Sequence, residues 1–266
     1  MYLSVDSAKR DPQNFKKVES DRLMMTNRDT DHSRTGILFV HGIVGSNRIF
    51  RFLIPHIPEE CPQLWITLAG HGGDASAFSK ASMAQWREQV RGGVEQLSSS
   101  CDRMIIVGHS MGCLLALSLA AHRKIEGMLL LNPPLRIRVR LKALTNILNA
   151  LSGKSSNGES PLDSYGLELD FNPLHYLGWP RRYLELFRES RMTRKLVETT
   201  RIYSDIVAVS GGDDELVSPE SLACFKHQPS CRQVSLPLAG HYSYSAADKN
   251  VICGLFSDLI VRISAS

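Results

Sequence analysis

The sequence predicts an α/β fold, in which a mostly parallel, doubly wound sheet carries an inserted helical segment. Three observations predict it. Short apolar segments bounded by turn residues alternate with longer stretches of helical periodicity along most of the 266 residues. This alternation stops at residues 134–201, where no convincing strand pattern is present. The composition, with 43% hydrophobic and 22% charged residues, is typical of a globular protein that buries a large core.

Six segments are predicted to form buried strands, because each is short, apolar and bounded by turn residues. They are residues 36–41, 63–68, 103–108, 127–132, 205–210 and 233–237. Helices are predicted between strands at residues 84–97 and 111–121, and an amphipathic helix at residues 246–263 closes the chain. Strands that alternate with helices pair in parallel, with crossover helices on both faces of the sheet. Before residue 36 the sequence is polar and irregular, and we expect at most a short edge strand there.

We interpret residues 134–201 as a helical lid inserted into a core formed by residues 1–133 and 202–266. Apolar residues recur at helical spacing from Leu141 to Leu151, residues 152–160 have loop composition, and a second helix is expected to start at Pro180. The lid holds 12 basic and 7 acidic residues, an excess larger than the net charge of +4 of the whole chain. We interpret this excess as a solvated helix face. The minor alternative is attraction of anionic substrates or of an anionic surface such as a membrane.

Composition excludes several other classes of protein. No apolar run approaches the roughly 18 residues that span a bilayer. The first ten residues lack the apolar core of a signal peptide, so we expect a cytoplasmic protein. The six cysteines are scattered without metal-binding spacing, and we expect them to be reduced and mostly buried. Basic and aromatic residues do not interleave in a nucleic-acid-binding pattern, so no nucleic-acid partner is expected.

The strongest chemical signal is the sequence Gly-His-Ser-Met-Gly at residues 108–112. It follows a predicted strand and precedes a predicted helix, which is the context of a G-x-S-x-G nucleophile elbow. The sharp turn strains the serine backbone and exposes its hydroxyl, and the two glycines avoid collisions around it. We therefore predict that Ser110 is a catalytic nucleophile. The alternative is an ordinary serine in a turn bounded by glycines.

A serine nucleophile needs a base, and the base needs an orienting acid. On a sheet of this kind the acid follows the serine and a histidine follows the acid. His241 comes directly after Gly240 at the end of the last predicted strand, and we predict that it is the base. Three acids follow the preceding strand, and we choose Asp214 because Leu216 and Val217 then anchor its loop. Asp213 is the main competitor, and Glu215 is the third acid of the turn.

The oxyanion that forms during ester cleavage needs two hydrogen-bond donors. We predict the N–H groups of Met111 and Ile43, the second of which follows a tight His-Gly turn at Gly42. His109 adjoins the nucleophile, and we expect it to be a packing or pocket residue rather than a base. Further substrate-binding candidates are the glycine of the turn and apolar lid residues, for which a place in the core is the alternative: Gly42, Leu144, Trp179 and Phe187.

Across residues 36–263, these motifs resemble the α/β-hydrolase superfamily. The motifs that carry the resemblance are His41-Gly42, Gly70-His71-Gly72, the Gly-His-Ser-Met-Gly elbow, Asp214 and Gly240-His241. The turn at residues 70–72, Met83-Ala-Gln-Trp86 and Asp214-Glu-Leu-Val217 look most like bacterial carboxylesterases of the monoacylglycerol-lipase-like branch. Leu68-Ala69 departs from that branch, which commonly has a proline before the Gly-His-Gly turn, and so does the arginine-rich lid.

The resemblance implies an activity. It implies a serine carboxylesterase that cleaves small-molecule esters through an acyl-enzyme and needs no metal or cofactor. The same triad also serves thioesterases, C–C bond hydrolases and acyltransferases, which remain the alternative interpretation.

Overall fold

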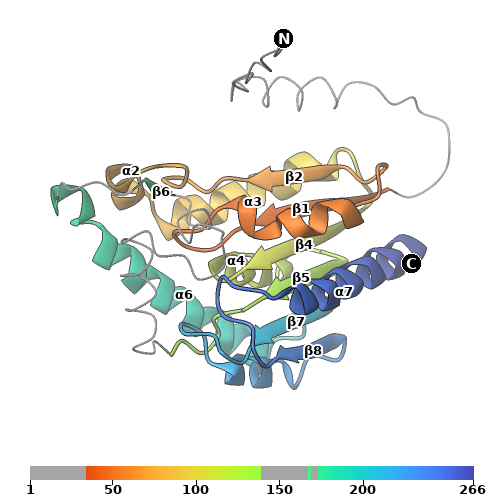
Figure 1. Cartoon of the computed structure of the whole chain (residues 1–266). Helices are drawn as coiled ribbons and strands as arrows, with labels where there is room; N and C mark the ends of the chain where they lie inside the picture. Colours follow the sequence, from red (N-terminus) through yellow and green to blue (C-terminus); the bar gives the residue numbers. More distant parts are fainter. Residues whose placement is uncertain (1–33, 139–166, 169–172) are drawn as a thin grey trace, which may run out of the picture. The chain divides into compact units, whose positions relative to one another are not determined.

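The computed structural model describes residues 34–138, 167–168 and 173–266. Its centre is a parallel sheet of six strands in the order β2-β1-β4-β5-β7-β8 (Figure 1). The strands are β1 (Thr35–Val40), β2 (Gln63–Ile66), β4 (Arg103–His109), β5 (Gly127–Leu131), β7 (Asp205–Gly211) and β8 (Cys231–Leu236). All six predicted strands are therefore confirmed, with bounds that differ by a few residues.

Side chains of each strand alternate between two hydrophobic cores, one on each face of the sheet. In β1, for example, Leu38 and Val40 join one core, whereas Ile37 and Phe39 join the other. The first core is closed by α3 (Met83–Ser98), α4 (Met111–Ala120), η4 (Pro219–Phe225) and part of α6 (Trp179–Thr199). The second core is closed by η1 (Asn47–His56) and α7 (Ala246–Ala265). The doubly wound prediction is confirmed.

Local sequence explains where the long helices begin. The Ser82 side chain caps α3 by accepting a hydrogen bond from the N–H of Gln85 (3.2 Å). Ser245 and Asp248 form a reciprocal capping box at the start of α7. In α6 a proline occupies the first turn, where its missing N–H costs nothing, and the predicted start at Pro180 is one residue late.

The inserted segment differs from its prediction in one respect. Residues 134–201 were expected to contain no strand, but β6 (Leu167–Glu168) pairs in parallel with β3 (Gly73–Asp74). A two-residue strand has no periodicity that a sequence pattern can reveal, which explains the error. The short helices α2 (Ala75–Lys80) and η3 (Pro173–Tyr176) adjoin this pair. The helix expected over residues 141–151, the loop at 152–160 and any edge strand before residue 34 lie outside the described residues.

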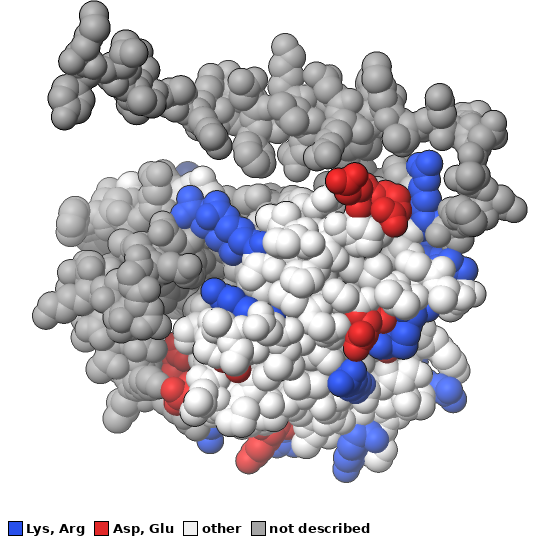
Figure 2. Space-filling view, turned by 45° about the vertical axis from the view of Figure 1, so that its right-hand side comes forward, with Lys and Arg blue, Asp and Glu red and all other residues white. Residues whose placement is uncertain are grey.

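The described surface and interior agree with the composition. No helix in the described part of the chain has the length and apolarity to cross a membrane. All six cysteines are unpaired; Cys101 and Cys231 are half-buried and the other four are buried. Figure 2 shows Lys and Arg dispersed among uncharged side chains, with no broad basic band among the described residues drawn there.

Candidate active site

The turn at Ser110 has the geometry of a nucleophile elbow. Ser110 joins β4 to α4 with φ 50° and ψ −119°, a conformation that costs a non-glycine residue on the order of 1–3 kcal/mol. A Cβ placed on Gly112 would lie 2.0 Å from the carbonyl oxygen of Val40, so no other residue fits there. The N–H of Ser110 donates to the carbonyl of Leu131 (2.9 Å), which ties the elbow to the neighbouring strand.

The structure brings Ser110, His241 and Asp214 together. His241 Nε2 lies 3.0 Å from Ser110 Oγ, and His241 Nδ1 lies 2.8 Å from Asp214 Oδ2. All three side chains are buried. A carboxylate only accepts hydrogen bonds, so Nδ1 carries the proton, and Nε2 is left to accept the hydroxyl of Ser110. In this arrangement hydrogen bonds connect the hydroxyl to the imidazole and the imidazole to the carboxylate.

Asp214, rather than its neighbours, is the acid in contact with the imidazole. Its second oxygen, Oδ1, accepts the N–H groups of Leu216 (2.8 Å) and Val217 (2.7 Å). Burial by itself would raise the pKa of this carboxyl, but His241 and the two N–H groups outweigh it and hold the pKa below its ordinary value. Glu215 contacts the base differently, because its Oε2 accepts the backbone N–H of His241 (3.2 Å).

The loop after β1 lies against the nucleophile. A Cβ placed on Gly42 would come within 2.8 Å of the Ser110 Cβ, so this glycine allows the close approach. The N–H groups of Ile43 and Met111 have no hydrogen-bond partner among the described residues. Tyr242 donates from its hydroxyl to the carbonyl of Ile43 (3.1 Å) and so links the base loop to this one. Two backbone donors are therefore left unused close to Ser110.

Two histidines, His41 and His71, hold this loop in place. Both occur in the sequence motifs, but the motifs do not reveal this role. His41 Nε2 accepts the N–H of Leu68 (3.1 Å), and His71 Nε2 accepts the N–H of Val44 (3.0 Å), a residue with φ 56°. Burial lowers the pKa of His41 to about 4 and that of His71 to about 3. Both rings are therefore neutral near pH 7, as acceptors at Nε2 must be.

The substrate-binding candidates are found in different surroundings. His109 is fully buried and donates from Nε2 to the carbonyl of His241 (2.9 Å), so this nitrogen carries a proton and faces the backbone. Trp179 is half-buried, packs on Phe78 with 4.9 Å between ring centroids, and donates from Nε1 to a backbone carbonyl of α2. Phe187 is 42% exposed on α6, so nothing in the described structure supports a pocket role for it. Leu144 lies outside the described residues.

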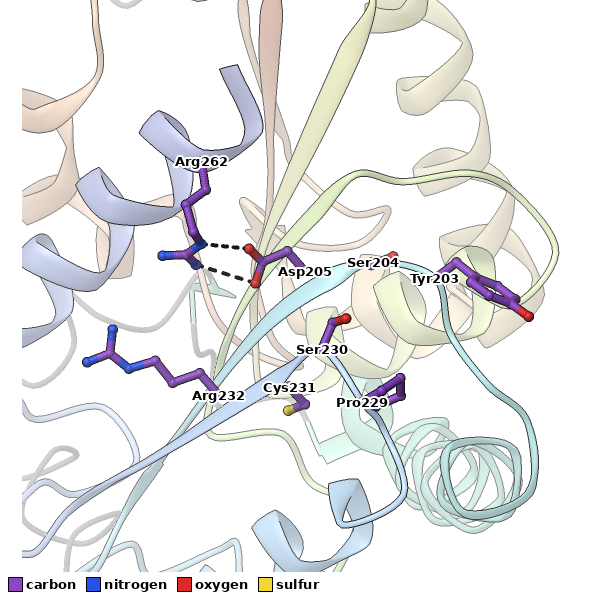
Figure 3. A pocket seen from close by; sticks show the side chains of 8 residues that line it. All are labelled: Tyr203, Ser204, Asp205, Pro229, Ser230, Cys231, Arg232 and Arg262. Carbon is purple, nitrogen blue, oxygen red and sulfur yellow. Dashed lines mark hydrogen bonds and ion pairs between the residues drawn. The ribbon is translucent and has the colours of Figure 1, made fainter. Parts of the chain in front are cut away.

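A separate cavity of about 650 Å³ lies at the amino ends of β7 and β8 (Figure 3). Ser110, Asp214 and His241, in contrast, all follow carboxyl ends of strands. Asp205 and Arg262 pair with each other in its wall (2.7 Å). Burial raises the pKa of the Cys231 thiol to about 12, so this cysteine is a poor nucleophile. Nor do the described residues contain a cluster of three His, Cys, Asp or Glu side chains that could hold a metal ion. Ser110, His241 and Asp214 are therefore the candidate reactive groups of the described residues.

Comparison with known proteins agrees with this architecture. The family model described as "Alpha/beta hydrolase family" matches residues 37–251. Among solved structures, one from work on the metagenome-derived lipolytic enzymes LipS and LipT has 18% identity and a TM-score of 0.66, and the match covers 87% of this chain and 95% of that one. A monoglyceride lipase from Saccharomyces cerevisiae has 16% identity and a TM-score of 0.65, with 89% of each chain covered.

A third solved structure has a different reaction in its name. The meta-cleavage product hydrolase CumD from Pseudomonas fluorescens has 13% identity and a TM-score of 0.56, with 87% of this chain and 92% of that one covered. Comparison with curated protein sequences finds no match. At these identities the similar structures show the fold alone.

Proposed function

The chain belongs to the alpha/beta hydrolase family, and from this membership and the geometry of the site we propose that it is a serine hydrolase of small-molecule carboxylic esters. The observation that carries the proposal is the continuous contact from the Ser110 hydroxyl through His241 to the Asp214 carboxylate. The elbow backbone and the unused N–H groups of Ile43 and Met111 support it. Ser110 is the nucleophile, His241 the base and Asp214 the acid.

In the first half of the proposed reaction, Ser110 Oγ attacks the ester carbonyl carbon while His241 Nε2 takes the hydroxyl proton. Asp214 stabilises the positive imidazole that results. The N–H groups of Ile43 and Met111 hold the oxyanion, and loss of one such donor costs about 3 kcal/mol in the barrier. The C–O bond of the ester then breaks, His241 gives its proton to the leaving alcohol, and the acyl group stays on Ser110.

In the second half, water attacks the acyl-enzyme and His241 takes a proton from it. The bond between the acyl carbon and Ser110 Oγ breaks, and the proton returns to the serine hydroxyl. The products are a carboxylic acid and the free enzyme, so no redox partner or metal ion takes part in the balance.

We assign the enzyme to the monoacylglycerol-lipase-like carboxylesterases, with residues 134–201 as the lid. The motif resemblance and the lipolytic enzymes among the similar structures support this branch. The second candidate is hydrolysis of a C–C bond, which the meta-cleavage product hydrolase favours because its fold is also similar. The two differ in the bond that is cleaved, which is the C–O bond of an ester in the first and a C–C bond, as in a diketone, in the second.

The test is hydrolysis of p-nitrophenyl esters from acetate to laurate by the wild-type protein and Ser110→Ala. We expect activity that peaks at short or medium chains and that Ser110→Ala loses almost completely, because no other group replaces the nucleophile. Ser98→Ala, at an exposed serine of α3, is the matched control and should keep full activity. A Ser110→Ala protein with most of the wild-type activity would contradict the proposal. A folded wild-type protein that cleaves diketones but no ester would favour the second candidate.

A further inference from the structure

Asn132 is a fully buried polar residue at the carboxyl end of β5, between the nucleophile strand and the acid strand. Its N–H donates to the carbonyl of Val209 in β7 (2.8 Å), and the carbonyl of Leu131 before it accepts the N–H of Ser110. Its φ is 51°, in the left-handed region that asparagine enters more readily than most residues. The backbone at this position therefore already restricts which residues fit.

The side-chain amide of Asn132 contacts both loops that carry the proposed acid and base. Oδ1 accepts the N–H of Gly211 (2.8 Å), the last residue of β7, directly before the acid loop. Nδ2 faces three oxygens on the base loop: the carbonyls of Gly240 and His241 (3.2 Å each) and the hydroxyl of Tyr244 (3.0 Å). These partners fix the orientation of the amide. If the amide were flipped, its oxygen would face the carbonyls of Gly240 and His241, and its NH2 group would face the N–H of Gly211.

The carbonyl of His241 accepts from a second buried side chain, since His109 Nε2 also donates to it (2.9 Å). On the other side of the residue, its N–H donates to Glu215. The backbone of His241 is thus held at both its N–H and its carbonyl, independently of the bonds that its ring makes to Asp214 and Ser110.

We propose that Asn132 is a positioning residue that holds the His241 backbone, and with it the imidazole, at hydrogen-bonding distance from Ser110. The inference rests on the proposed function and adds to it a residue that does not touch the reacting atoms. Asparagine meets both demands of the position, because it tolerates the backbone conformation and presents an acceptor and a donor on one short side chain. Without it, the acid and base loops lose their shared connection to β5.

The main test is Asn132→Gly, which keeps the backbone conformation and removes the amide. We expect kcat on a p-nitrophenyl ester to fall about 10- to 100-fold with KM within about twofold, because a misplacement of a catalytic group by about 1 Å costs up to about 100-fold. The matched control is Gln228→Ala, which removes another buried amide that binds three backbone groups at the carboxyl end of α6 and directly after it. Rates are compared at equal folded fraction, and kcat of the control should stay within about twofold of wild type.

In the kinetic comparison, the proposal would be overturned if Asn132→Gly kept at least half of the wild-type kcat, or if Gln228→Ala lost as much kcat as Asn132→Gly. Labelling with a fluorophosphonate separates this failure from failure of the proposed function. In that reaction the Ser110 Oγ–P bond forms, the P–F bond breaks, and the hydroxyl proton leaves through His241 with fluoride. If the wild-type protein is not labelled at Ser110, the proposed function is contradicted. If wild type is labelled and Asn132→Gly is labelled equally fast, only the role of Asn132 is contradicted.

Asn132→Asp is the second variant, in case the glycine variant does not fold. It keeps the shape, the left-handed backbone and the acceptor for Gly211, but when ionised it has no donor for the carbonyl of His241. We expect the ratio of its kcat to that of wild type to rise as the pH falls from 9 to 6, because a protonated carboxyl restores the donor. The titratable groups near this position are His109, His241, Asp214, Glu215, Tyr244 and Cys113, and wild type measured over the same pH range is the reference for them. A constant ratio would overturn the proposal.

Discussion

Asp214 is oriented by the backbone before it meets the imidazole. One carboxylate oxygen accepts two N–H groups of its own loop, and the other accepts Nδ1–H of His241. The carboxylate therefore keeps its position even if the ring moves. Because its pKa lies below the ordinary value, the carboxylate is ionised near pH 7.

Asp214→Asn keeps the shape of the side chain and removes its charge. We expect kcat on a short-chain ester to fall about 10³- to 10⁴-fold with little change in KM, because the imidazole loses both its fixed tautomer and its stabilising charge. Asp213→Asn is the informative control, since Asp213 is the acid that the sequence offers as a competitor. Steady-state kinetics of the two variants decide the assignment, and a larger loss of kcat in Asp213→Asn would reverse it.

Sequence patterns point to Ser110 and His241 but not to Asn132. The difference is the separation along the sequence between each residue and the features that mark it. Ser110 and His241 follow strands and stand beside glycines, so local patterns mark them. Asn132 contacts His241 across 109 positions of sequence, and its neighbours Pro133 and Pro134 give no sign of that contact. Its role depends on two loops meeting in space, which only the fold establishes.

At the scale of elements, α6 divides its charges between its two sides. Glu189 is 2% exposed on the inner side and accepts from Arg87 of α3 and Ser118 of α4. The arginines Arg188 and Arg191, in contrast, are exposed on the outer side. The bases of this helix therefore differ in their surroundings, because Arg188 and Arg191 are exposed, whereas Arg182 is buried and pairs with Glu185, and the acid Glu189 attaches the helix to the core.

Glu189→Ala tests whether this acid anchors α6. We expect the free energy of unfolding to fall by about 1–3 kcal/mol, because Ser118 and Arg87 lose a charged acceptor and only Arg87, which is 44% exposed, regains water. Glu95→Ala is the control, because the pair of Glu95 with Arg91 is about half exposed on both sides and such pairs contribute about 0–1 kcal/mol. Urea denaturation gives both values, and an equal effect of the two substitutions would contradict the anchoring role.

Strands and helices could be predicted where their sequences have a clear hydrophobic periodicity. Six apolar strands and the helices α3, α4 and α7 have clear patterns, and the proline in the first turn of α6 marks its start within one residue. The two-residue pair of β3 and β6 has no such pattern, because it forms only when residues 73–74 and 167–168 come together in the fold.

At the scale of the whole molecule, three buried histidines make folding depend on pH. Burial lowers the pKa of His41 to about 4 and the pKa values of His71 and His109 to about 3. In the unfolded chain the same groups take up protons below about pH 6.5. Between pH 6.5 and pH 4 the unfolded state therefore binds more protons than the folded state, and the free energy of unfolding must rise with pH across that window.

We accordingly expect the free energy of unfolding to be largest above pH 6.5 and to fall as the pH drops, with a slope near pH 5 of about 4 kcal/mol per unit from three such groups. Urea denaturation at pH 7, 6 and 5 measures this slope. His71→Gln keeps a donor and an acceptor for the loop but does not titrate, so it should lower the slope by about one third. His227→Gln, at an exposed position, should leave the slope unchanged. Equal free energies of unfolding at pH 7 and pH 5 would mean that these histidines are not held neutral by the fold.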